Sequence, residues 1–321
     1  MRYKTILLSC ALLLWSTSCL VGEAATKEGQ AEPESVAQSS PRNEPPNESL
    51  RVISYNTYYV FSEGTEVQAG TDWITRQAAD VVALQELTNI TEDRLSELAA
   101  GWDHPHSALL KTSGFSVGLT STSPIEVLES IRDDMHHGSL HARIDGIHFF
   151  VVHLSPFRWA KRASEAEILL ARIQPLLDRG EDVLVLGDFN ALSPADRQLI
   201  DAQPAVLEKY RTSDAKHAHV TNLRNDAFDY SVMQRFLEAG LEDPALPFLE
   251  QSGATRWTIQ TGIWSEAKTD PPDGGTRIDF VLASPALART ATEGHVPRTG
   301  VLNRTSDHYP VCVEFQRIQH P

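Results

Sequence analysis

From residue 50 onward, short apolar runs rich in β-branched residues alternate with stretches of helical periodicity, and this alternation constrains the fold most. The apolar runs at 50–56, 80–86, 115–121 and 182–190 have the length and composition of buried strands. The stretch 140–154 contains two such runs around Asp145-Gly146, a dipeptide typical of a tight hairpin turn. We expect three further strands near the C-terminus, at 254–259, 276–283 and 309–315.

Helical stretches separate several of these strands. We expect helices at 72–79, 91–100, about 163–177 and 229–239, the second beginning at the N-cap residue Thr91 and the last ending at Gly240. The polar stretch 193–227 predicts a helix plus a loop. Because some strands are joined by hairpins and others by helices, we predict one α/β domain over residues 50–317. In it, two packed mixed sheets are flanked by helices.

The N-terminal segment has the features of a secretory signal over residues 1–19. Arg2 and Lys4 precede an apolar stretch from 6 to 15, and small residues then lead to Cys19. A bacterial lipoprotein signal would make Cys19 the lipidated first residue, whereas ordinary cleavage would follow Ala24 or Ala25. Both remain open, so we expect a secreted or periplasmic protein, anchored to the membrane only if Cys19 is lipidated. Residues 20–49 have the Pro-, Glu- and Ser-rich composition of a disordered linker.

The composition is that of a soluble acidic protein, with 41% hydrophobic residues, a net charge of −15 and a pI near 5.2. Such a charge disfavours non-specific DNA binding, which needs basic residues to neutralise phosphates. It does not exclude a nuclease, because a bound dication inverts the local potential of an acidic cleft. Cys312 lies in an apolar run and is expected to be a small core residue rather than a nucleophile.

Polar side chains stand at or near the ends of the expected strands. They are Asn56, Glu86, His153, Asp188, Asn190 and Asp279, and Asp307-His308 opens the last strand. Each has an ordinary structural interpretation, but together they indicate a rigid site on one rim of the sheets. Carboxylates and amides without cysteine favour Mg²⁺, or Mn²⁺ or Ca²⁺, over zinc. A histidine beside a carboxylate is suited to acid–base chemistry or to stabilising charge on phosphorus.

The motifs SYN, LQE, VHL, GDFN, RIDF and SDHYPV, in this order between residues 50 and 315, resemble the endonuclease/exonuclease/phosphatase superfamily. The resemblance implies a DNase I-like four-layer α/β/β/α sandwich. It also implies divalent-metal-dependent hydrolysis of a phosphoester by a metal-activated water.

The resemblance assigns Glu86 as the principal metal ligand, with Asn56 beside it and Asp307 as a further carboxylate on the metal side. It makes Asp188 the residue that orients or deprotonates the attacking water, and Asn190 a ligand of a phosphate oxygen.

His308, steadied by Asp279, corresponds to the dyad that contacts the scissile phosphate, and His153 binds that phosphate or assists the leaving oxygen. Two positions depart from the family pattern. Tyr58 stands where many relatives have a second acidic or amide residue, and Thr122 where many have a basic one.

Candidate substrate-binding residues are Arg158 and Trp159, in the segment SPFRWAKRASEA just after His153, and Arg277 in RIDF. The alternatives are a helix start with solvated basic residues for the segment, and a surface ion pair for Arg277. His217 and His219 of the 193–227 insertion could cover the site or be solvated. The run DDMHHGSLH could suggest a metal patch, but a loop is favoured.

Three functions are compatible with these features. The first is an extracytoplasmic phosphodiesterase or phosphatase acting on a small or lipid-linked phosphate; the second is a secreted nuclease for DNA or RNA; the third is an inactive binding module on the same fold. The acidic charge favours the first, so a nucleic-acid partner is allowed but not preferred. We expect a monomer whose only membrane contact is an N-terminal lipid anchor.

Overall fold

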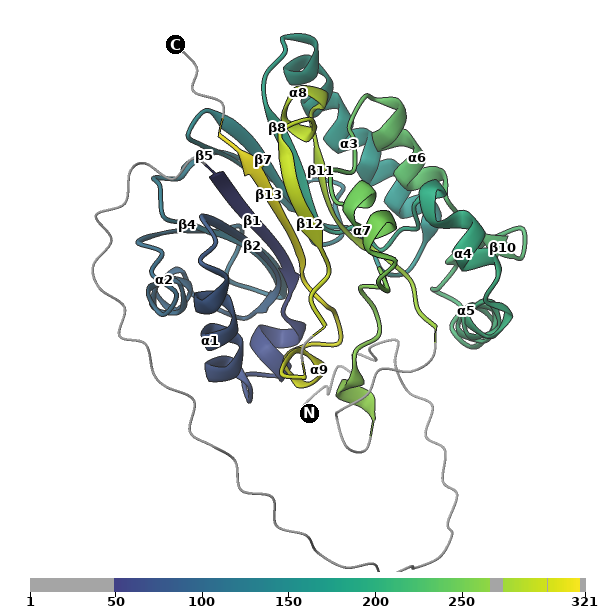
Figure 1. Cartoon of the computed structure of the whole chain (residues 1–321). Helices are drawn as coiled ribbons and strands as arrows, with labels where there is room; N and C mark the ends of the chain where they lie inside the picture. Colours follow the sequence, from purple (N-terminus) through teal and green to yellow (C-terminus); the bar gives the residue numbers. More distant parts are fainter. Residues whose placement is uncertain (1–48, 266–273, 299, 318–321) are drawn as a thin grey trace, which may run out of the picture. The chain divides into compact units, whose positions relative to one another are not determined.

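The computed structural model describes residues 49–265, 274–298 and 300–317 (Figure 1). Thirteen strands in these ranges form two large sheets and a small hairpin. The predicted signal segment, and the predicted linker up to residue 48, lie outside the described residues.

The first sheet has the order β12-β13-β1-β2-β4-β3. Its strands are β1 (Ser49–Asn56), β2 (Val81–Thr88), β3 (His106–Leu109), β4 (Phe115–Ser121), β12 (Ala291–His295) and β13 (Val311–Gln316). At its centre β1 runs parallel to β2 and antiparallel to β13. The last strand of the chain therefore pairs with the first.

The second sheet has the order β11-β8-β7-β6-β5. Its strands are β5 (Glu126–Ile131), β6 (Ser139–Ile144), β7 (Ile147–His153), β8 (Val183–Asp188) and β11 (Asp279–Ala283). Strands β6 and β7 form the predicted hairpin, in which Ile144 pairs with Ile147 across Asp145-Gly146. β7 and β8 are parallel, and the helix between them crosses the outer face of the sheet.

Helices cover the outer faces of both sheets (Figure 1). Helices α1 (Val67–Gln77) and α2 (Glu92–Ala100) lie outside the first sheet, and α3 (Trp159–Asp178) and α6 (Ser231–Glu238) lie outside the second. The remaining helices are α4 (Arg197–Asp201), α5 (Pro204–Lys216), α7 (Leu246–Ser252), α8 (Pro285–Ala288) and α9 (Leu302–Thr305). Short helical turns are η1 (Tyr58–Ser62), η2 (Pro194–Asp196) and η3 (Gly262–Trp264), and the small hairpin is β9 (Leu223–Arg224) with β10 (Ala227–Phe228). This is the predicted α/β/β/α sandwich.

Strand β8 shows why the central strands read as continuous apolar runs. Leu184 and Leu186 belong to the core between the sheets, whereas Val183 and Val185 belong to the core beneath α3 and α6. A strand buried on both faces needs no polar alternation. Cys312 belongs to the hydrophobic core, as expected, and is a free buried cysteine.

Several element boundaries differ from those expected. The segment 254–259 is not a strand and forms only isolated bridges, at Ile259. Asp279 begins β11 instead of standing near the end of a strand. Helix α3 starts at Trp159, four residues earlier than expected, and 193–227 contains α4, α5 and the β9–β10 hairpin. The short strands β3, β5 and β12 were not predicted, because four to six residues at a sheet edge carry little periodicity.

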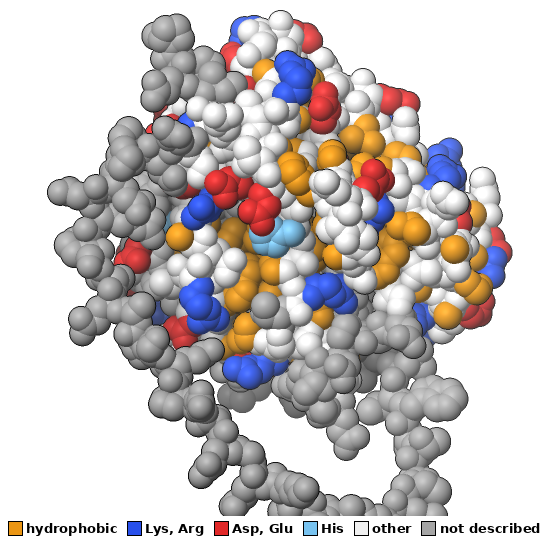
Figure 2. Space-filling model, viewed as in Figure 1, with side chains coloured by type: hydrophobic (Ala, Val, Ile, Leu, Met, Phe, Trp, Pro, Cys, Tyr) orange, Lys and Arg blue, Asp and Glu red, His pale blue; other side chains and the backbone are white. Residues whose placement is uncertain are grey.

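No helix within the described ranges is long and apolar enough to cross a membrane. On the face shown in Figure 2, Lys and Arg side chains are interspersed with Asp and Glu, and no continuous basic stripe is visible there.

Candidate active site

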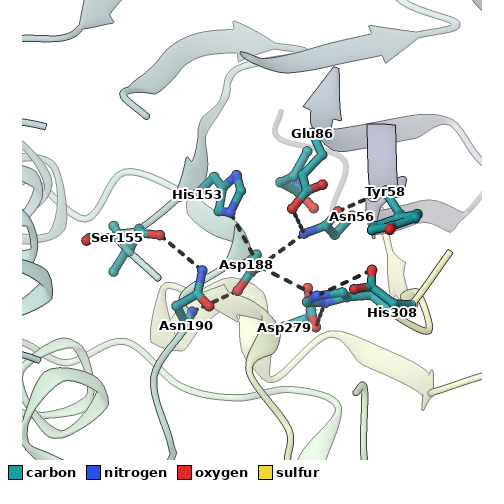
Figure 3. Close-up of polar contacts among 12 residues, drawn as sticks. Asn56, Tyr58, Glu86, His153, Ser155, Asp188, Asn190, Asp279 and His308 are labelled. Carbon is teal, nitrogen blue, oxygen red and sulfur yellow. Dashed lines mark hydrogen bonds and ion pairs between the residues drawn. The ribbon is translucent and has the colours of Figure 1, made fainter. Parts of the chain in front are cut away.

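Polar side chains from both sheets meet at one rim of the sandwich (Figure 3). Asn56, His153 and Asp188 are the last residues of β1, β7 and β8. Strand β11 is antiparallel to β8, and its first residue, Asp279, pairs directly with Asp188. Because the two strands are antiparallel, the first residue of β11 lies at the same rim as the last residue of β8. Asp279 is therefore at the site, as predicted, but at the start of its strand and not near its end.

Asp188 is the centre of this cluster. Its Oδ2 accepts a hydrogen bond from Nδ2 of Asn56 at 3.1 Å and lies 3.5 Å from Nε2 of His153 and 3.9 Å from Nε2 of His308. Its Oδ1 accepts from the backbone N–H of Asn190 at 2.8 Å. The side chain is 2% exposed. One carboxylate therefore joins the two sheets and both histidines.

The backbone before Asp188 requires glycine. Gly187 has φ +144°, and a Cβ at this position would lie 1.9 Å from the carbonyl oxygen of Val152. The close approach of β7 and β8 brings His153 and Asp188 side by side at the ends of two parallel strands. The glycine of GDFN is therefore a condition for the site's geometry.

His308 is held by Asp279 through a 2.8 Å hydrogen bond from Nδ1 to Oδ2, with both side chains almost fully buried. Burial alone would lower the pKa of His308, but the charge of Asp279 and this hydrogen bond outweigh burial and raise it well above its ordinary value. The backbone N–H of Asp279 in turn donates to Oγ1 of Thr258. The dyad predicted from the sequence is thus a buried imidazolium–carboxylate pair, with Nε2 directed at Asp188.

A β-bulge directs Glu86 toward the cluster. The register of β2 against β4 shifts between Leu84 and Leu87, and Glu86 has φ +58°. Bulges turn side chains away from the ordinary alternation and occur next to active sites. Its Oε1 lies 3.4 Å from Nδ2 of Asn56, whose Oδ1 accepts from the backbone N–H of Tyr58. Asn56, with both ends of its amide engaged, orders the carboxylates of Glu86 and Asp188.

The loop before β13 is fastened to β1. Oγ of Ser306 donates to the carbonyl of Asn56 at 2.6 Å and accepts from the N–H of His308 at 3.0 Å. The backbone N–H of Thr261 donates to the carbonyl of Asp307. These bonds hold Asp307 and His308 over the end of the first sheet.

Known proteins resemble this chain in sequence profile and in fold. The sequence profile of the Endonuclease/Exonuclease/phosphatase family matches residues 71–308, more than half of the chain. The chain belongs to this family. A search of curated proteins finds no match.

Solved structures with the same fold include an AP endonuclease from Archaeoglobus fulgidus, with a TM-score of 0.63 and 18% identity. They also include NExo from Neisseria meningitidis, titled a 3′-5′ exonuclease, with a TM-score of 0.62 and 20% identity. A third is Neisseria NExo, titled a 3′ phosphatase bound to a product DNA hairpin, with a TM-score of 0.62 and 18% identity. Each comparison covers 84% of this chain and 100% of the other. At these identities the likeness concerns the fold.

Endonucleases, exonucleases and phosphatases all hydrolyse phosphoester bonds, so this family member is a phosphoester hydrolase. Its rim has the electrostatics of a dication site. Burial and the charge of Asp307 raise the pKa of Glu86 to about 8, and burial and the charge of Asp279 raise that of Asp188 to about 7. Burial also raises the pKa of Asp307. Carboxyl groups with raised pKa values indicate missing positive charge.

Buried carboxylate oxygens without a hydrogen-bond donor indicate where a cation would bind. Among the described residues, Oε2 of Glu86, Oδ1 of Asp307 and Oδ1 of Asp279 are buried without a hydrogen-bond donor. Hard dications such as Mg²⁺ take carboxylate oxygens as ligands. The residues therefore fit a divalent cation, and Glu86 and Asp307 would hold it.

A second grouping also has ligand spacing, since one donor atom from each of Asp188, Asp279 and His308 lies within 4.8 Å of the others. Here, however, Nδ1 of His308 already bonds Asp279, and the raised pKa of His308 keeps the ring protonated. A protonated imidazole is not a ligand. This trio is better suited to proton transfer and charge stabilisation.

Asn190 and His153 complete the rim on the side of the second sheet. Asn190 has φ +48°, a left-handed conformation that Asn tolerates, and its Nδ2 donates to the carbonyl of Leu154 at 3.1 Å. Burial and the nearby His308 lower the pKa of His153 to about 3, so its ring is neutral. A neutral imidazole beside Asp188 can accept or donate one proton.

The sequence interpretation missed His137 by assigning it to an ordinary loop. Its ring stacks on that of His153, with centroids 4.0 Å apart and planes at 19°. Glu165, which is buried, accepts hydrogen bonds from the N–H groups of His136 and Ser155 and so joins this loop to the end of β7. The paired histidines before β6 were the available signal, but nothing local indicated that they would face His153.

The three residues predicted to bind substrate lie in different environments. Arg158 is exposed, and its Nε donates to the carbonyl of His219 at 3.0 Å. Trp159 is half-buried beneath the guanidinium of Arg224. Arg277 is 1% exposed and pairs with Asp196 at 2.8 Å and Asp243 at 2.6 Å. Because Arg277 is buried and pairs with two internal carboxylates, it stabilises the fold, and its assignment to substrate binding is not supported.

Proposed function

We propose that this chain is an extracytoplasmic, divalent-metal-dependent phosphoesterase that acts on a small or lipid-linked phosphodiester or phosphomonoester. The observation that carries the proposal is the buried cluster of Glu86, Asp188, Asp279 and Asp307 around the imidazolium of His308. Four carboxyl groups clustered around one imidazole favour binding of a dication and of a substrate that carries charge of its own.

A dication bound at Glu86 and Asp307 would neutralise phosphate charge and lower the pKa of a water molecule. The protein's own groups supply the remaining steps. Oδ2 of Asp188 orients the attacking water and accepts its proton. Nε2 of His308, kept protonated by Asp279, donates to a non-bridging phosphate oxygen, where charge accumulates. Asn190 and the neutral ring of His153 contact the phosphate from the other side, His153 beside the leaving oxygen.

Extracytoplasmic location is proposed from the N-terminal segment alone. A basic start, an apolar stretch and Cys19 after small residues are typical of export signals. With a lipid on Cys19, the linker would hold a monomeric enzyme at a membrane surface. Incorporation of labelled palmitate in a bacterial host, and its loss in Cys19→Ser, would support the anchor; equal labelling of both would refute it.

Nuclease activity is the second candidate. The structures that share the fold are titled as an AP endonuclease, an exonuclease and a DNA complex. The net charge of −15 disfavours binding of long nucleic acids, because it weakens attraction to a polyanion. We therefore place small phosphoesters first.

The test is hydrolysis of bis(p-nitrophenyl) phosphate by the purified protein with Mg²⁺ or Mn²⁺. EDTA should abolish it, and Asp188→Ala should lower kcat by about 10³-fold. The matched control is Asp178→Ala, at an exposed carboxylate at the end of α3. Activity that survives both EDTA and Asp188→Ala would refute the mechanism. Plasmid DNA, RNA, sphingomyelin, inositol phosphates and sugar phosphates, assayed in parallel, would rank substrates, and rapid plasmid nicking without turnover of the others would reverse our order.

A further inference from the structure

A continuous row of aromatic and imidazole rings borders the candidate active site. Neighbouring rings contact one another with centroid distances between 4.3 and 5.8 Å, mostly edge to face. In order along the row they are Trp264, Tyr58, Tyr59, Phe115, His137, His136, Phe157, His219 and His217. They come from six separate segments of the chain, so only the fold assembles them. We call this set the aromatic row.

The aromatic row touches the catalytic cluster at several points. His137 stacks on His153. The N–H of Tyr58 donates to Oδ1 of Asn56, and the charges of Asp307 and Glu86 help to raise the pKa of the Tyr58 phenol, after burial as the main cause. Trp264 follows Thr261, whose N–H holds the carbonyl of Asp307. The aromatic row therefore lies directly beside the catalytic cluster.

Many of these rings are accessible. His136, His219 and Trp264 are exposed, Trp264 at 47%, and Tyr59, Phe115 and Phe157 are half-buried. All but the two phenylalanines carry a ring nitrogen or a hydroxyl group. Such rings suit a flat, polar-edged partner that stacks on them, whereas an acyl chain would be better served by aliphatic side chains.

The backbone is strained to present one end of the row. Residues 58–63 all have φ between +45° and +62°, a left-handed turn made without glycine. The left-handed conformation is unfavourable for residues with a side chain. Strain of this kind persists where a site depends on it. The turn directly follows Asn56 and displays Tyr58 and Tyr59.

Basic side chains brace the other end of the row. Nζ of Lys111 donates to the carbonyl of His137 at 2.6 Å, Nε of Arg158 to that of His219, and Nζ of Lys161 to that of Asp134. Within the described part of the chain, Lys111 and Arg158 have no carboxylate in ion-pair range. These two side chains add positive charge beside the row.

We propose that the aromatic row is the binding surface for a flat, ring-bearing group esterified to the substrate phosphate, with a nucleobase as the chemical class that fits it. This rests on the proposed phosphoesterase function and narrows it to small nucleotide-type esters. Stacking on an aromatic side chain contributes about 1–3 kcal/mol per base, which corresponds to about 5- to 150-fold in affinity.

The test compares two esters that release the same p-nitrophenolate, thymidine 5′-(p-nitrophenyl) phosphate and methyl p-nitrophenyl phosphate. The wild type should prefer the thymidine ester, and Phe115→Leu and Phe157→Leu should each lower the ratio of kcat/KM values by at least about fivefold. Phe228→Leu removes a half-buried ring that contacts Tyr210 outside the row and should leave the ratio unchanged.

A binding readout accompanies the kinetics. Calorimetric titration of the protein with thymidine 5′-monophosphate in EDTA should show binding that weakens in both row variants. If the wild type hydrolyses neither ester, the proposed function fails. If it hydrolyses both, but the ratio and the binding do not respond to the variants, the aromatic row is not the base-binding surface. Preference for a short-chain phospholipid over the thymidine ester would also overturn the inference.

Discussion

The buried pair of His308 and Asp279 allows a sharp prediction for Asp279→Asn. At 2.8 Å between Nδ1 and Oδ2, two unit charges attract by about 6 kcal/mol at an effective dielectric constant of about 20. Losing this attraction should therefore lower the pKa of His308 strongly. Burial then favours the neutral ring, so a smaller fraction of the imidazole is protonated at neutral pH.

The assay has two readouts. The His308 ring can be titrated by NMR, and kcat for bis(p-nitrophenyl) phosphate measured from pH 5 to 9. We expect the variant to lose about 10³-fold in kcat at pH 7 and to recover part of it as pH falls, because acid restores the imidazolium. Asp145→Asn, at an exposed carboxylate that pairs with Arg317, is the matched control. A folded Asp279→Asn protein with kcat within tenfold of the wild type at pH 7 would refute the role of the dyad.

Three further predictions concern the cation site and the scaffold. In EDTA, the free energy of unfolding should fall as pH rises from 4.5 to about 8, because folded Glu86 keeps a proton that the unfolded chain releases. Mg²⁺ should remove this fall, and Glu86→Gln should flatten it. Urea titrations at pH 5, 7 and 8.5 measure the effect, and a flat wild-type profile would contradict the prediction. Arg277→Met should cost about 3–5 kcal/mol, because it leaves buried Asp243 without its cation and Asp196 with Arg256 alone. Arg211→Met, in an exposed pair with Asp226, should cost much less, and equal losses in urea unfolding would show that burial is not decisive. Gly187→Ala should lower the melting temperature sharply and abolish activity, because its Cβ would collide with the Val152 carbonyl. The control Gly180→Asn, at a position with open space around it, should behave as wild type. A stable, active Gly187→Ala protein would disprove the packing argument.

Much of the fold and of the site was predictable because each signal is local. Strands buried on both faces, such as β8, are uninterrupted apolar runs in the sequence. The dipeptide Asp145-Gly146 predicts a hairpin turn independently of where its strands lie in the fold. The strand-end polar residues were recognisable because buried apolar runs rarely stop at a carboxylate and an amide without a reason. The short edge strands β3, β5 and β12 lacked such signals.

The errors share one cause, which is that they concern partners distant in the sequence. Arg277 lies next to Asp279, so proximity suggested a role in the site, yet its guanidinium turns to Asp196 and Asp243. His137 lies in a polar loop that only the packing of β6 and β7 brings against His153. Burial and pairing are properties of the folded neighbourhood, and no window of sequence contains them.

Residue patterns alone were enough to predict the class of fold, the family motifs and the identity of the acids and histidines on the rim. The charge states of those groups and their surroundings depend on the folded structure. It buries Glu86 and Asp188 until their pKa values rise, pairs Asp279 with His308, and gathers rings from residues 58 to 264 into one row. Periodicity and motifs depend on residues that are close together in the sequence, whereas desolvation and long-range contacts exist only after the chain has folded.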